Sequence, residues 1–322
     1  MNKYYKPMLP TLVDSVPKGS NWIYEAKYDG FRCLLYISEE RIEMISRNLI
    51  NISDSFPEII NEIKRNIDIF EKHKPLVLDG EIVILESQFR ADFEKIQIRG
   101  RTKNEKKINQ LASVTPAHYI AFDMLMDQGI SLMNEPLLLR KKHLSKLFSD
   151  FDLNSKNYQT SKLLNIEFFK KSEELLHHIE SEYGEGIVAK KANSTWDEGA
   201  RTTNWLKIKN WKKANFIILS YEKQNGYFHV GLVKEQQIVH AGLFLHGIKD
   251  EERMALYKII KTNATKEDSK FIFIDPSICV ELLFLDWYKD EIRQPRFSQF
   301  RLDVTWEACT WEEARKRTMK SS

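Results

Sequence analysis

Residues 22–32 read WIYEAKYDGFR, which places Lys27 between apolar side chains and a turn at Asp29 and Gly30. An ammonium group becomes a nucleophile only after it loses its proton, which requires partial burial or neighbouring positive charge to lower its pKa. The flanking aromatic side chains and Arg32 offer both. We therefore expect Lys27 to be a nucleophile at a strand edge, although this stretch alone is also typical of a surface lysine beside a hairpin turn.

Segments further along the chain carry the charges that a phosphate site needs. They read SRN at 46–48, LVLDGEIVI at 76–84, EGIVAKK at 185–191 and WLKIK at 205–209. A carboxylate inside an apolar strand is costly unless it binds something. Strand alternation would place Lys207 and Lys209 on one face. Together these segments predict two carboxylates that hold a metal and several cations that hold phosphates.

In this order the segments resemble the motifs of the covalent nucleotidyltransferases and, within them, of the ATP-dependent DNA ligases. A closer resemblance is to the ligase module of bacterial ligase D, the end-joining ligase of spore-forming bacteria. It rests on RADFE at 90–94, RGR at 99–101, the stretch 185–191 and DPSIC at 275–279. The resemblance implies an ATP-dependent ligase that seals 5′-phosphate/3′-hydroxyl breaks through a lysyl-AMP and a DNA-adenylate, in double-strand break repair by end joining.

The resemblance and the hydrophobic pattern predict an α+β fold in two domains. Residues 1–212 should form an adenylation (nucleotidyltransferase) domain of antiparallel sheets and helices, and residues 213–322 an OB-fold β-barrel. Apolar spacing predicts helices over 56–70 and 168–179, the second ending at Gly184 as a left-handed cap. The second domain shows a pattern typical of an OB barrel, with strands at 216–221, 227–233, 238–245 and 280–287 and a helix at 250–260.

The resemblance also implies roles for individual residues. Lys27 would attack the α-phosphorus of ATP, and Glu25 would accept a hydrogen bond from the adenine amino group. Phe122 would stack on the base, with an ordinary core phenylalanine as the alternative. Lys190 would support its strand. Further nucleotide contacts are expected at Arg32, Arg47, Glu81, Arg201, Lys207 and Lys209, and a divalent metal, Mg²⁺ or Mn²⁺, at Glu81 and Glu185.

DNA contacts are expected from local clusters of positive charge, because the net charge of the 322 residues is only +3. Basic residues crowd the segment 95–107, where a solvated loop is the alternative interpretation. The residues we expect to contact DNA are Arg99, Arg101, Lys103 and Arg301.

The segment RLDV at 301–304 departs from the ligase pattern, which usually ends the barrel with Arg-x-Asp-Lys. That lysine helps to align the leaving pyrophosphate, and Val304 cannot bind phosphate. Either another cation replaces it, or self-adenylation is slow, or Arg301 does not belong to the motif. The nearby candidates are Lys289, Arg293 and Arg296.

Other features suggest a monomer in the cytoplasm, associated with the nucleoid. No apolar run approaches the roughly 20 residues of a membrane helix, and the N-terminal residues lack the core of a signal peptide. The three cysteines are distant in sequence, which argues against a disulfide framework or a zinc knuckle. The expected partners are nicked or broken double-stranded DNA and, by resemblance, a bacterial Ku protein. The sequence leaves open whether this is a stand-alone ligase or one module of a longer ligase D.

Two other functions remain compatible with the sequence. An RNA ligase or GTP-using capping enzyme would share Lys27 and the WLKIK segment, but Glu25 and the ligase D segments argue against it. A non-catalytic DNA-end-binding protein is suggested only by Val304.

Overall fold

The computed structural model describes residues 3–151, 158–316 and 318. The chain forms two compact units, which divide between Asn210 and Trp211. The first unit carries all the predicted nucleotide contacts.

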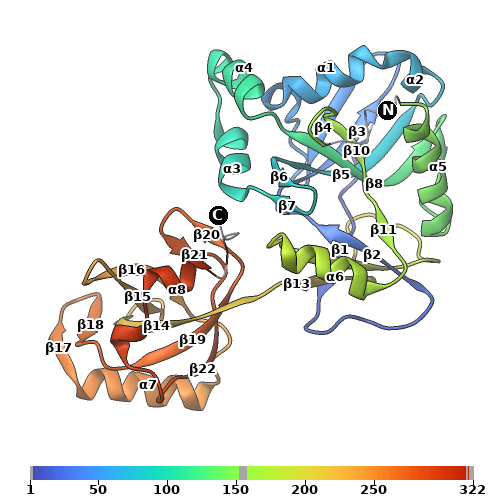
Figure 1. The fold of residues 1–322 in the computed structure, drawn as a ribbon. Helices are drawn as coiled ribbons and strands as arrows, with labels where there is room; N and C mark the ends of the chain where they lie inside the picture. The colour runs from blue at the N-terminus through green and yellow to red at the C-terminus, as the bar shows by residue number, and fades with distance from the viewer. Residues whose placement is uncertain (1–2, 152–157, 317, 319–322) are drawn as a thin grey trace. The chain divides into compact units, whose positions relative to one another are not determined.

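The first unit contains two main sheets (Figure 1). One is six-stranded, in the order β10-β8-β5-β3-β4 with β9 beside β8, and the other is five-stranded, in the order β1-β13-β12-β2-β11. Most neighbours are antiparallel, whereas β1 with β13 and β10 with β8 are parallel. The strands are β1 Leu9–Leu12, β2 Trp22–Lys27, β3 Phe31–Ile37, β4 Ile42–Ser46, β5 Leu76–Val83, β6 Leu85–Ser87, β7 Arg90–Ala91, β8 His118–Asp127, β9 Ile130–Ser131, β10 Leu163–Asn165, β11 Phe168–Phe169, β12 Gly186–Lys191 and β13 Arg201–Lys209.

The helices of this unit cover the outer faces of the sheets. Side chains from α1, α2 and α5 join one core with the six-stranded sheet, and side chains from α6 join another with the five-stranded sheet. A further apolar cluster, which includes Leu34, Phe122 and Trp205, lies between the sheets. The helical segments are η1 Ser53–Ser55, α1 Pro57–Arg65, α2 Ile67–Glu71, α3 Phe93–Arg101, α4 Glu105–Val114, α5 Leu137–Ser149 and α6 Ser172–Ser181.

Two predicted helices differ from the structure. The helix expected over 56–70 is interrupted at Asn66, which separates α1 from α2. Phe168 and Phe169 are not helical, because they pair with β2 as the short strand β11. The left-handed residue after α6 is Tyr183, with φ of 57°, and not Gly184. Gly184 is needed for space, since a Cβ there would lie 2.5 Å from the carbonyl oxygen of Phe89.

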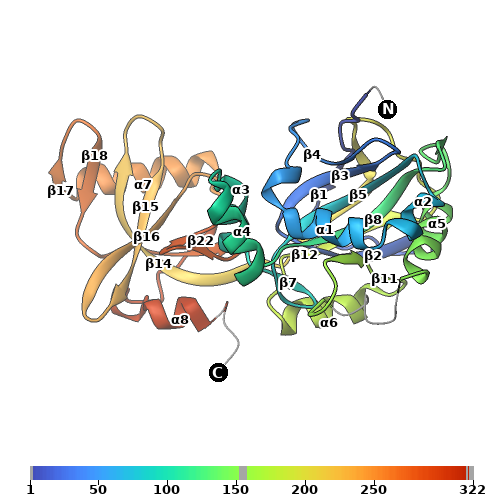
Figure 2. The ribbon, with the colours of Figure 1, turned by 90° about the horizontal axis from the view of Figure 1, so that it is seen from above.

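The second unit is built on a curled seven-stranded sheet (Figure 2). The long strand β14 pairs with β19 along its first half and with β15 and β18 along its second half. An isolated bridge between His246 and Arg296 joins the end of β16 to β22, which closes the path β16-β15-β14-β19-β22. Apolar side chains of α7 pack into the core of this unit. The elements are β14 Lys212–Glu222, β15 Phe228–Lys234, β16 Gln237–Phe244, α7 Asp250–Thr262, β17 Ala264–Glu267, β18 Phe271–Ile274, β19 Cys279–Phe284, β20 Trp287–Tyr288, β21 Glu291–Ile292, β22 Arg296–Phe300, η3 Trp306–Ala308 and α8 Trp311–Lys316.

The three cysteines are buried free thiols. Two of them, Cys279 and Cys309, are brought together by the second unit, with 3.6 Å between their Sγ atoms. In the described part of the chain, no helix is both long enough and apolar enough to cross a membrane.

Candidate active site

A cleft in the first unit collects most of the predicted nucleotide contacts. Adjacent strands bring them together: β2, β12 and β13 of one sheet and β3, β5 and β8 of the other. The residues that line the cleft include Glu25, Lys27, Arg32, Arg47, Glu81, Phe122, Lys190, Arg201, Trp205 and Lys207. Lys209 is not among these lining residues. It lies on β13 two residues after Lys207 and pairs with Gly186 of β12.

Lys27 makes an ion pair with Glu185, with 2.6 Å between Nζ and a carboxylate oxygen. The Lys27 side chain is 21% exposed and that of Glu185 only 9%. Gly186, which follows Glu185, pairs with Lys27 and has a φ of 147°, and a Cβ there would lie 2.1 Å from the carbonyl oxygen of Ile208 on β13. Only glycine fits this position without a clash.

The charge around Lys27 is opposite to the prediction from its sequence neighbours. Burial lowers the pKa of Lys27, but the attraction of Glu185, Asp29 and Glu81 outweighs burial, so the pKa is raised overall. The expectation that Arg32 and burial lower it is therefore wrong for the protein without bound ligands. Three carboxylates stabilise the ammonium form.

Arg32 is held by the buried carboxylate of Asp79. Its Nε and one terminal nitrogen donate to the two carboxylate oxygens at 2.7 and 2.6 Å. Trp196 also donates to Asp79, at 3.0 Å. The guanidinium lies 4.1 Å from the ring centroid of Phe122. Asp79, which is fully buried, therefore orients a cation at the cleft and is not itself placed to bind a ligand.

Glu25 is the most buried carboxylate that lines the cleft, at 1% exposed. One of its oxygens is paired with Lys141 and the other with Lys190, the latter at 2.6 Å. Lys190 Nζ also lies 4.3 Å from the ring centroid of Phe122 and 4.1 Å from that of Trp205. Lys190, which we expected to support its strand, therefore also lines the cleft.

The pairing of Lys141 with Glu25 was not predicted from the sequence. The signal was present, because Lys141 follows Leu137 by four residues and precedes Leu144 by three on a helix, which places it on the apolar face. A lysine in such a stripe requires a buried partner.

Glu81 and Lys207 line the same cleft, and the pKa of each is shifted from its ordinary value. Burial raises the pKa of Glu81 to about 8, against the opposing effect of Arg32 and Lys27. Burial lowers the pKa of Lys207, and the nearby charges of Lys27 and Arg201 add to the effect. Among the residues that the structure describes, no group of three or more His, Cys, Asp or Glu side chains is arranged to hold a metal. Glu81 and Glu185 would fit a magnesium-type site only if substrate oxygens completed it.

Arg99 does not belong to a DNA-binding surface. Its side chain is 1% exposed and lies 2.7 Å from a carboxylate oxygen of Glu58, and it also donates to the carbonyl oxygens of Ser55 and Thr115. The expectation that Arg99 contacts DNA is wrong, because a buried ion pair occupies its guanidinium. Arg101 and Lys103 are exposed.

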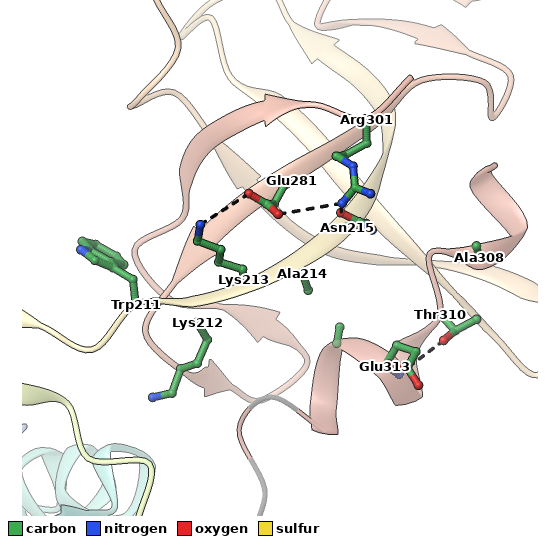
Figure 3. Close-up of a pocket in the computed structure, with 11 residues that line it drawn as sticks. Trp211, Lys212, Lys213, Ala214, Asn215, Glu281, Arg301, Ala308, Thr310 and Glu313 are labelled. Carbon is green, nitrogen blue, oxygen red and sulfur yellow. Dashed lines mark hydrogen bonds and ion pairs between the residues drawn. The ribbon is translucent and has the colours of Figure 1, made fainter. Parts of the chain in front are cut away.

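Arg301 lies in the second unit and is already bound by side chains of this unit (Figure 3). Two of its nitrogens donate to the carboxylate of Asp303 at 2.9 and 2.8 Å, and the third donates to Asn215 at 2.9 Å. Glu281 stands between it and Lys213, at 3.9 and 4.0 Å. Val304 packs against the core of the second unit.

A family model described as an ATP dependent DNA ligase domain matches residues 7–209. The chain belongs to the ATP-dependent DNA ligase family. The match covers the unit that contains the cleft with Lys27. The family predicted from the ordered motifs is thus confirmed.

Individual proteins agree with this assignment. The chain is 36% identical over 308 residues to the bifunctional non-homologous end joining protein LigD of Bacillus subtilis strain 168, an alignment that covers 95% of this chain and 50% of LigD. The chain therefore spans about half the length of that relative. The predicted resemblance to ligase D is confirmed.

Solved structures support the fold. A mycobacterial DNA ligase D complexed with ATP and MES is similar with a TM-score of 0.50 and 20% identity, covering 94% of this chain and 98% of the other. A structure from a study of DNA binding by Lig E DNA ligases has a TM-score of 0.60 and 16% identity, covering 91% and 99%. The predicted fold class, a nucleotidyltransferase fold followed by an OB-type barrel, is confirmed.

Proposed function

We propose that this chain is an ATP-dependent DNA ligase that works through a covalent AMP on Lys27. The observation that carries the proposal is the position of Lys27: its Nζ lies in a cleft lined by the cations Arg32, Arg47, Arg201 and Lys207 and next to the carboxylate of Glu185. Positive groups around one amine suit the binding of a polyphosphate.

The reaction requires three transfers. Neutral Lys27 Nζ attacks the α-phosphorus of ATP, a P–N bond forms, and pyrophosphate leaves. The AMP then passes to the 5′-phosphate of a DNA break, which releases Lys27. Finally the adjacent 3′-hydroxyl attacks this phosphorus, expels AMP and closes the phosphodiester. Since charge spreads over phosphoryl oxygens in each step, positioning and electrostatics supply most of the catalysis.

Lys27 must give up the proton that its carboxylate neighbours stabilise. We propose that polyphosphate binding among the cations of the cleft brings the α-phosphorus to Nζ and that Glu185 holds the side chain until then. Glu81 and Glu185 would hold a divalent metal, Mg²⁺ or Mn²⁺. When bound, the metal would neutralise charge on the phosphate oxygens.

The base end of the cleft suits adenine. Glu25 offers carboxylate oxygens, which accept hydrogen bonds and cannot donate when ionised. An amino group at position 6 of a purine matches such an acceptor, whereas the carbonyl of guanine would be repelled. Phe122, 7% exposed, is the aromatic side chain proposed to contact the base.

We propose nicked or broken double-stranded DNA as the substrate. Arg101 and Lys103 are exposed on the first unit and are suited to phosphate contacts, and Arg301 is proposed to contribute from the second. Similarity to LigD supports a role in end joining with a bacterial Ku protein as partner. A monomer in the cytoplasm, associated with the nucleoid, is part of the same proposal.

The test is incubation of the protein with ATP and Mg²⁺, followed by intact-mass spectrometry and peptide mapping. We expect an AMP adduct on Lys27 that forms with ATP in preference to GTP, and sealing of a nicked duplex. A preference for GTP would indicate an RNA ligase or capping enzyme. No adduct, on protein shown to be free of AMP beforehand, would indicate a DNA-end-binding protein without catalysis.

A further inference from the structure

Glu25 is held between two buried lysines that come from different parts of the chain. Lys141, 3% exposed, approaches one oxygen from α5, and Lys190, 2% exposed, approaches the other from β12. The carboxylate itself lies on β2. Burying three ionised groups is expensive, and each lysine would be left as an uncompensated charge without Glu25.

The two lysines differ in what else they contact. Lys190 lines the cleft and lies against the rings of Phe122 and Trp205, so a bound base would meet it directly. Lys141 is not among the residues that line the cleft, in the part of the chain that the structure describes. Its ammonium group is therefore linked to the cleft through Glu25.

We infer that Lys141 is a positioning residue for base selection, which holds one oxygen of Glu25 so that the carboxylate is aimed to accept from an amino group and to reject a carbonyl. This inference rests on the proposed function, in which Glu25 contacts the base. The chemistry is specific. A carboxylate offers only acceptors, so it favours an amino group over a carbonyl when its oxygens are held in a fixed direction.

The expected consequence is a loss of selectivity instead of a general loss of binding. With Lys141 replaced by methionine, the apolar stem is kept and the ammonium is removed. Glu25 then retains one cation, Lys190, and the oxygen that Lys141 held is no longer fixed in direction. The affinity for ATP should fall relative to the affinity for GTP. Hydrogen bonds to charged groups are strong enough for the ratio of the two affinities to change by about tenfold or more.

The experiment measures binding in a Lys27→Ala background, where no covalent adduct on Lys27 can form. The melting temperature is measured at increasing concentrations of ATP and of GTP, which gives an apparent dissociation constant for each nucleotide. The ratio of the constant for GTP to the constant for ATP is then compared between Lys141→Met and the parent. Lys142→Met is the matched control, because Lys142 is the next residue on the same helix but is exposed. We expect the ratio to fall in Lys141→Met and to stay unchanged in Lys142→Met. An unchanged ratio in Lys141→Met overturns the inference.

A second comparison uses Glu25→Gln. If Lys141 acts through Glu25, the double variant Lys141→Met/Glu25→Gln has the same ratio of dissociation constants for GTP and ATP as Glu25→Gln alone. A further change in the double variant would show that Lys141 acts by another route. This pair also serves if Lys141→Met alone does not fold, since the double variant removes both charges. An AMP adduct assay on the otherwise unaltered protein is run in parallel: its failure contradicts the proposed function, while the binding ratio still decides the role of Lys141.

Discussion

The Nζ atom of Lys27 lies 2.6 Å from a carboxylate oxygen of Glu185, although 158 positions separate the two residues in the chain. The contact depends on the pairing of β2 with β12, in which Gly186 stands opposite Lys27. It holds the ammonium group in the cleft and keeps it protonated. The nucleophile that we propose is therefore held in place in its protonated form, and its activation would require the charge balance of the cleft to change.

Lys27→Arg should distinguish the structural effect of the ion pair with Glu185 from the ability of Lys27 to form an AMP adduct. Arginine keeps the positive charge for Glu185 but does not lose its proton, so no AMP adduct should form. The free energy of unfolding should change by no more than about 1 kcal/mol, because an ion pair remains possible. Intact-mass spectrometry and urea unfolding measure the two effects. Lys27→Ala is the control that removes both the positive charge and the amine. An adduct on Lys27→Arg would place the nucleophile elsewhere.

Asp79→Asn should destabilise the first unit. It leaves the guanidinium of Arg32, 16% exposed, without its charged partner, and breaking a buried ion pair costs about 3–5 kcal/mol. Urea unfolding of the whole chain measures the change. Glu40→Gln, at an exposed position, should alter the free energy of unfolding by less than about 0.5 kcal/mol. If the two variants were equally stable, the Arg32–Asp79 pair would have no structural role.

Arg99 and Arg101 should respond in opposite ways to substitution. Arg99→Met leaves Glu58 buried without its cation and should cost about 3–5 kcal/mol of stability. Arg101→Ala removes an exposed side chain and should leave stability nearly unchanged, while it weakens binding to nicked DNA and lowers the salt dependence of that binding by about one ion. Unfolding curves and a salt titration of DNA binding distinguish the two. Normal DNA affinity in Arg101→Ala would remove this residue from the proposed surface.

His118 should make the protein sensitive to acid. Burial lowers the pKa of His118 to about 4, and the charge of Lys162 adds to this effect. The ring donates from Nε2 to the carbonyl oxygen of Tyr158 at 2.7 Å. In the unfolded chain the pKa returns to the ordinary value of about 6.5. Between these values the unfolded state binds more protons than the folded state, so stability present above pH 6.5 is lost as the pH falls toward 4.

From pH 7 to pH 5 this group should remove about 2 kcal/mol of stability. Urea unfolding at the two pH values, with His118→Gln as the comparison, isolates its share, because the other titrating groups are common to both proteins. Equal losses in the two proteins would show that His118 does not titrate in this range.

Val304→Lys restores the residue that the ligase pattern usually carries after Arg-x-Asp. We expect the rate of self-adenylation not to fall, because a lysine there would add a cation for phosphate, and Val304 is only partly buried against the core. The rate of adduct formation with ATP is the measurement. A large drop would show that the segment 301–304 does not correspond to that motif.

The ordered motifs could be predicted from the sequence because each depends on local features. Strand alternation places Lys207 on the same face as Trp205, and both line the cleft as a result. The same holds for Glu25 and Lys27 on β2. Residue type, spacing of two and motif order were therefore enough to identify the family and most of the residues of the cleft.

Only the tertiary structure decided the partners of those residues. Lys141 reaches Glu25, Asp79 binds Arg32 and Glu58 binds Arg99 through contacts between elements far apart in the chain. These partners also determine whether a charged side chain lines the cleft, as Arg32 does, or is buried in the core, as Arg99 is. The carboxylates around Lys27 reversed the expected direction of its pKa shift. The physical reason is that electrostatic and burial energies depend on distance in space, while a sequence pattern reports only which face of an element a residue occupies.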